Sequence, residues 1–158
     1  MSQILVALSL WLHSLATVVF IGHYVLLAVI YLPAISKNFA AGAGGNVLSE
    51  MSKGSRKWIY AALVVLAMTG TYLTLVDPKY LGLGDFGNAW AILMLVKHIL
   101  ILGMLAAGFW FNAIMRAGSM LSANTGSEQA LNRYRSFVNG MAVSGVLVLL
   151  LTALAQMQ

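Results

Sequence analysis

The stretch "WAILMLVKHILILGMLAAGFWFNAIM", residues 90–115, decides the fold class of this chain. It is apolar along almost its whole length, and its one formal charge is Lys97. A helix of about 20 apolar residues crosses the hydrocarbon layer of a bilayer, which is roughly 30 Å thick. Because the backbone finds no water there, a continuous apolar run without period-two alternation predicts a membrane-spanning helix.

The composition of the whole chain agrees with a membrane protein. Of its 158 residues, 61% are hydrophobic and only 8% are charged, a balance that soluble domains of this length do not normally show. The apolar segments expected to span the membrane are residues 4–32, 58–76, 90–115 and 137–155. We therefore predict an all-α integral membrane protein, a four-helix up-down bundle that forms a single domain over residues 1–158.

The distribution of cations predicts the orientation. Seven of the nine Lys and Arg residues lie in the first and third connections: Lys37, Lys53, Arg56, Lys57, Arg116, Arg133 and Arg135. The positive-inside rule places these connections in the cytoplasm, so both termini are expected outside. Because the charges flank apolar spans, they indicate an anionic lipid surface as the partner and argue against nucleic acid.

Ionisable residues inside the expected spans are the candidates for function. They are His13, His23, Lys97 and His98. A charged side chain at this depth costs about 2.5 to 3.5 kcal/mol on insertion scales, so such residues are rare and are functional by default. The chain has no cysteine, which excludes thiolate metal sites and covalent haem attachment.

His13 and His98 are expected at one depth. They lie nine and eight residues beyond the outer ends of the first and third spans, which places both about 12 to 14 Å below the outer boundary. In an up-down bundle these two spans run in the same direction and face each other diagonally. Two such imidazoles suit a haem iron that takes one axial ligand from each face. They could instead supply two ligands to copper, with methionine completing a Cu(I) site.

The adjacent Lys97 and His98 side chains diverge by about 100° around the helix. If His98 faces the iron, Lys97 flanks it and can pair with a propionate. If Lys97 faces the bundle axis, it is itself an axial ligand or a proton donor. The sequence leaves this choice open.

A second site is expected deeper in the membrane. His23 lies about 15 Å beyond His13 along the first span, and Met68 of the second span is expected at the same depth as His23. Together they could hold a second haem or Cu(I). The alternative for every one of these histidines is structural, because a histidine in a membrane can simply bond a backbone carbonyl or a hydroxyl of a neighbouring helix.

Glycines recur along the spans at Gly70, Gly103, Gly108, Gly140 and Gly145. Small residues let membrane helices approach closely, so we expect these positions at helix contacts. Room for a flat cofactor is the alternative interpretation.

The segments "WLHSLATVVFIGHYVLLAVIYLPAI" and "ALVVLAMTGTYL", together with Lys97, Gly108 and Asn112, resemble the copper resistance D (CopD-like) domain. The resemblance covers nearly the whole chain and implies a four-helix, multi-pass unit of the bacterial inner (plasma) membrane, with periplasmic termini. The family name implies copper, whereas the extra histidines His23 and His98 depart from the family pattern and favour haem.

The histidine of the first span and the lysine of the third, with Tyr31-Leu32-Pro33, also resemble the HemJ-type haem-binding membrane proteins. That resemblance implies haem b. Ala34 stands where that family has a basic residue, and a downstream histidine of the family is absent, which argues against the HemJ reaction itself.

Three functions follow as expectations. The first is a membrane cytochrome or oxidoreductase with b-type haem held by His13 and His98, with Lys97 as an ionic or alternative ligand, passing electrons to a redox partner. The second is copper transport or copper tolerance. The third is a cofactor-free subunit that packs into a larger membrane complex or a homo-oligomer. Whether the chain is an enzyme is left open.

Overall fold

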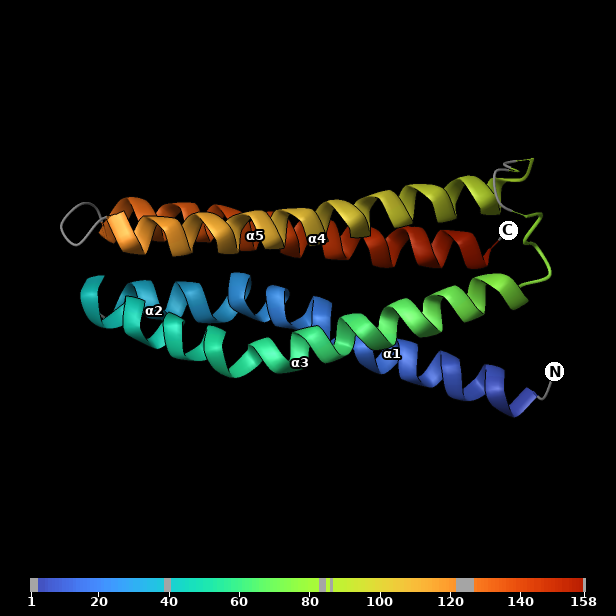
Figure 1. Ribbon diagram of the computed structural model, residues 1–158, viewed down its shortest axis with the longest axis horizontal. Coiled ribbons are helices and arrows are strands. Elements are labelled where there is room, and N and C mark those ends of the chain that lie inside the picture. The colour runs from blue at the N-terminus through green and yellow to red at the C-terminus, as the bar shows by residue number, and fades with distance from the viewer. Residues whose placement is uncertain (1–2, 39–40, 83–84, 86, 122–126, 158) are drawn as a thin grey trace.

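The structure, a computed structural model, describes residues 3–38, 41–82, 85, 87–121 and 127–157, without the side chains of residues 38, 41–46, 49, 112–121 and 127–131. Every regular element in these residues is helical. The elements are α1 (Gln3–Leu26), the π-helical segment η1 (Leu27–Tyr31), α2 (Leu32–Asn38), α3 (Ala41–Val76), α4 (Ala89–Leu121) and α5 (Ser127–Gln156). The long helices lie side by side in an elongated bundle, and both marked termini lie at the same end of it (Figure 1).

Helices long and apolar enough to cross a membrane cover Gln3–Lys37, Glu50–Val76, Ala89–Phe111 and Asn132–Gln156. This confirms the all-helical class and the four expected spans. The helices themselves are longer than predicted, most of all α3, which begins at Ala41 although its span was expected from residue 58. The prediction followed apolar residues only, whereas helical hydrogen bonding continues through the polar segment that carries Lys53 and Lys57.

The first span also continues past its predicted end, through a local change of helix type. Proline has no N–H group, so Pro33 cannot bond the carbonyl of Val29 and it interrupts the regular pattern. The N–H of Leu32 bonds the carbonyl of Leu27 instead, five residues back, which is the π-helical spacing. The chain therefore stays helical to Asn38 instead of ending near Leu32.

The packing of the helices is unequal. α1 packs along both α3 and α5, whereas within the described residues the extensive helix contact of α4 is with α5. Phe20 and Ile21 of α1, Met104 of α4 and Met141 of α5 are buried in one apolar cluster that joins these helices. α1 and α4 are therefore linked mainly through α5.

An aromatic cluster strengthens this link in the half of the bundle away from the termini. The rings of Phe111 on α4 and Phe137 on α5 are stacked, with centroids 4.2 Å apart. Tyr24 of α1 meets Phe137 edge to face at 6.3 Å, and Phe20 meets Tyr24 in the same way at 5.6 Å. Such pairs add about 0.5 to 1.5 kcal/mol each beyond the area they bury.

Candidate functional site

His13 lies on α1 at the contact with α3. Its Nδ1 atom is 2.8 Å from Oγ1 of Thr69, a side chain that is only 8% exposed. The ring also lies against Gly70, where an added Cβ would come within 3.2 Å of the His13 Cε1 atom. The His13 ring is therefore held by a neighbouring helix.

Lys97 and His98 lie on α4, and the position at which this helix begins sets how far along the bundle they lie. The Asn88 side chain caps this helix, because its Oδ1 accepts a hydrogen bond of 2.7 Å from the N–H of Ala91. Trp90 is buried next to Ala155 of α5 and fixes the helix against its neighbour. Counted from the helix starts at Gln3 and Ala89, His13 and His98 lie about 15 Å and 14 Å into the bundle.

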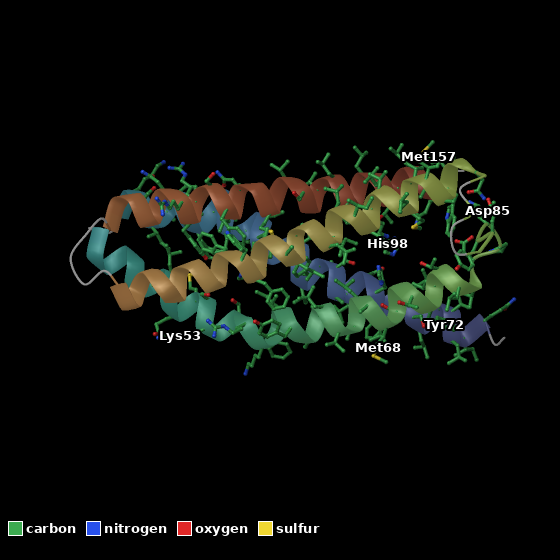
Figure 2. All side chains as sticks on the ribbon, turned by 45° about the horizontal axis from the view of Figure 1, so that its top comes forward. Lys53, Met68, Tyr72, Asp85, His98 and Met157 are labelled. Atoms are coloured by element: carbon green, nitrogen blue, oxygen red, sulfur yellow. The ribbon has the colours of Figure 1, made fainter. Side chains whose placement is uncertain are left out.

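Lys97 and His98 lie on α4, about as many residues from the start of their helix as His13 lies from the start of α1. Figure 2 shows His98 on the side of α4 that faces α3, the helix that contacts His13. We call the four residues His13, Thr69, Lys97 and His98 the mid-span cluster. The cluster thus takes its residues from α1, α3 and α4, of which α1 and α4 are linked mainly through α5.

Lys97 and His98, between which the sequence left the choice open, differ in burial. The Lys97 side chain is half-buried, whereas the His98 side chain is exposed. His98 Nδ1 lies 2.6 Å from the carbonyl oxygen of Met94, one turn back on the same helix. Because a carbonyl only accepts, Nδ1 carries the proton and donates it, and the lone pair of a neutral His98 lies on Nε2.

The second expected site is not formed as predicted. Met68 directly precedes Thr69, whose hydroxyl contacts His13, so Met68 lies at the depth of His13 and not of His23. Its side chain is 70% exposed and points away from the bundle (Figure 2). The error arose because depth was counted from the ends of a span whose helix extends much farther than its apolar part.

His23 stands apart from the mid-span cluster. It is half-buried on α1, and its ring meets the adjacent Tyr24 ring at 5.3 Å. It lies ten residues, about 15 Å, along the helix from His13.

Thr69 is the member of the mid-span cluster that reasoning from residue types did not identify. It was noted only within the segment "ALVVLAMTGTYL", whereas the neighbouring Gly70 was expected at a helix contact. A usable signal was present, because a hydroxyl in the middle of a span needs a hydrogen-bond partner and a histidine at the same depth is a suitable one. Asn112, also noted in the resemblance, has a side chain outside the described residues.

The donor set limits what the cluster can hold. Among the described residues there is no group of three or more His, Cys, Asp or Glu side chains placed to hold one metal ion. Two imidazoles suffice for a haem iron, whose other four ligands belong to the porphyrin. Within the same described residues Lys97 has no carboxylate at salt-bridge distance, so a bound group with a negative charge would find an uncompensated cation here.

Comparison with known proteins gives no assignment. No family model, no curated protein and no solved structure matches the chain.

Proposed function

We propose that this chain is a membrane haem protein that binds b-type haem through His13 and His98 and serves electron transfer within the bilayer. Haem would supply one-electron redox chemistry that none of the protein's own side chains provides. The chain's contribution is the two imidazoles, the nearby Lys97 cation, and helices that keep the site at mid-membrane depth.

The observation that supports the proposal best is the state of the two imidazoles. Each ring uses Nδ1 for a hydrogen bond, to Thr69 in one case and to the Met94 carbonyl in the other. Histidines that bind metals characteristically hold their second nitrogen in this way, which fixes the ring and raises the basicity of the ligating nitrogen. In both rings Nε2 is then the nitrogen left for iron.

Lys97 supports an anionic cofactor. A cation inside a membrane is costly unless it is paired, and the described acidic residues Glu50, Asp77 and Asp85 lie in the polar segments outside the middle of the spans. A haem propionate is an anion of suitable chemistry for this position.

Copper transport has weaker support. Of the copper sites expected, the one formed by His23 and Met68 has lost its methionine, since Met68 is 70% exposed and points away from the bundle. The resemblance to CopD-like and HemJ-type proteins involves His13 and Lys97, which belong to the mid-span cluster. That this chain is related to either family is a proposal. The hydrogen bonds of His13 to the Thr69 hydroxyl and of His98 to the Met94 carbonyl are also those of structural histidines, so Lys97 is the residue that favours a cofactor over a cofactor-free subunit.

We also propose that the protein lies in the bacterial inner membrane with both termini on the outer side. The described cations Lys37, Lys53, Arg56 and Lys57 belong to the segments around the start of α3. That end of the bundle is opposite to the end that carries both termini, and Lys53 lies there in Figure 2, far from Asp85. The positive-inside rule makes it the cytoplasmic end.

The test is a visible spectrum of the full chain, purified in mild detergent and recorded oxidised and after dithionite reduction, together with metal analysis. We expect a Soret band and a sharp reduced α band in the wild type. His13→Ala and His98→Ala should each lose most of the bound haem, whereas His23→Ala, a half-buried histidine of the same span, should keep it. Helical circular dichroism checks that each variant is folded.

Other outcomes would overturn the proposal. Bound copper without a Soret band would indicate the copper function. Neither haem nor metal in freshly purified protein would favour the cofactor-free subunit. Equal haem content in all four proteins would show that the histidines of the cluster are not its ligands.

A further inference from the structure

The Thr69 hydroxyl makes two hydrogen bonds, and the chemistry of its partners determines which atom donates in each. Its Oγ1 lies 2.6 Å from the carbonyl oxygen of Val65, one turn back on α3, and 2.8 Å from Nδ1 of His13. The carbonyl can only accept, so the hydroxyl proton goes to Val65. Oγ1 must then accept a hydrogen bond from His13, which makes His13 the Nδ1–H tautomer with its lone pair on Nε2.

The surroundings of Thr69 stabilise its hydrogen bond with His13. Its side chain is 8% exposed, so solvent competes little for the hydroxyl. The backbone at Gly70 lies directly beside the ring, since even one added carbon would be 3.2 Å from Cε1. The His13 ring is thus held by a hydrogen bond at Nδ1, and the backbone of α3 lies close to the adjacent Cε1 atom.

The two histidines of the cluster differ in this respect. His98 bonds a carbonyl of its own helix and its side chain is exposed, so no second helix fixes its ring through a described contact. His13 is fixed by α3, which packs extensively on α1.

We propose that Thr69 is a positioning residue, with Gly70 providing the space, and that it holds His13 as the Nδ1–H tautomer so that Nε2 is presented as a ready ligand. The role in haem binding rests on the function proposed above. The tautomer does not, because it follows from the hydrogen bonds of the protein alone. α1 and α3 would then form the preorganised half of the site and α4 the adaptable half.

The experiment compares Thr69→Val, which keeps the shape but lacks the hydroxyl, with Thr69→Ser, which restores it. ¹⁵N chemical shifts of His13 in the detergent-solubilised full chain report the tautomer, with His13→Gln used to assign the signals. We expect Nδ1–H in the wild type and in the serine variant, and a mixture of both tautomers in the valine variant.

Haem titration gives the second measurement. Loss of an outer hydrogen bond to a ligating histidine typically costs about 10- to 100-fold in affinity, so the valine variant should bind haem that much more weakly and the serine variant nearly as well as the wild type. The midpoint potential of the valine variant should rise, because a less basic imidazole stabilises oxidised iron less.

Each result is decisive for one of the two claims. An unchanged His13 tautomer in Thr69→Val would overturn the positioning role. A changed tautomer in a protein that never binds haem would uphold that role and overturn the haem function. Equal loss of thermal stability in both variants, with unchanged tautomer and affinity, would mean that Thr69 is merely structural.

Discussion

Lys97 is a charged side chain within a membrane-spanning helix, where an anionic partner would stabilise it. It is half-buried on α4, and within the described residues it has no acidic neighbour at salt-bridge distance. A positive charge near a redox centre favours the reduced state, which carries one positive charge fewer. Lys97 therefore bears on the potential of a bound haem whether or not it touches a propionate.

Replacing Lys97 by Gln should lower the midpoint potential. Two charges about 12 Å apart at an effective dielectric constant of about 20 interact by roughly 1.4 kcal/mol, a tenfold change in the equilibrium. For a one-electron couple this corresponds to about 60 mV. Redox titration followed at the α band measures it, with Lys97→Arg as the control that keeps the charge. A potential that is equal in all three proteins would place Lys97 outside the electrostatic reach of the haem.

Among the helices, the closest approach that the glycines reveal is between α1 and α5. A Cβ at Gly145 would lie 2.8 Å from Cγ2 of the buried Ile21. By contrast, Gly103, Gly108 and Gly140 have no atom within 4 Å of such a carbon, apart from their own helix and chain neighbours. Of the five glycines expected at helix contacts, only Gly70 and Gly145 lie where a neighbouring helix leaves little room for a side chain. This contact matters for the site, because α5 is the helix that links α4 to α1.

Gly145→Ala should therefore destabilise the bundle, by about 1 to 3 kcal/mol as for other overpacked cores. Gly140→Ala on the same helix is the matched control, since its added methyl group meets open space. Thermal unfolding in detergent, followed by circular dichroism, should show a lower midpoint for the first variant and no loss for the second. A lower midpoint in both would point to a general effect of substituting glycine in α5 rather than to the contact with Ile21.

The whole molecule is apolar on the outside as well as within. Leu8, Val18, Ile99, Phe109 and Trp110 are all more than half exposed, and they are distributed over α1 and α4. In water such a surface would aggregate, whereas in a bilayer it contacts lipid tails. The mid-span cluster therefore lies in a helical bundle whose outer surface suits a membrane environment.

The proposed orientation can be tested with single cysteines, because the natural chain contains none. A membrane-impermeant maleimide added to intact bacterial spheroplasts should label Asp85→Cys and leave Lys53→Cys unlabelled until the cells are lysed. Both positions are exposed, so a difference in labelling reports sidedness and not burial. The reverse pattern would put the termini in the cytoplasm.

The sequence by itself determined the helical class and the four helices long and apolar enough to cross a membrane. These depend on composition, on apolar runs and on a fixed rise per residue, all of which are local properties of the chain. Helix ends were less predictable, because α3 begins at Ala41 and remains helical through a polar segment that precedes its apolar run.

Only the tertiary structure decided which side chains meet. Thr69 and Met68 are neighbours in sequence, yet Thr69 is buried against His13 and Met68 points away from the bundle. The same holds for the half-buried Lys97 and the exposed His98. Adjacent residues on a helix diverge by about 100°, so the rotation of each helix against its neighbours, which packing sets, determines which of two neighbours faces the site.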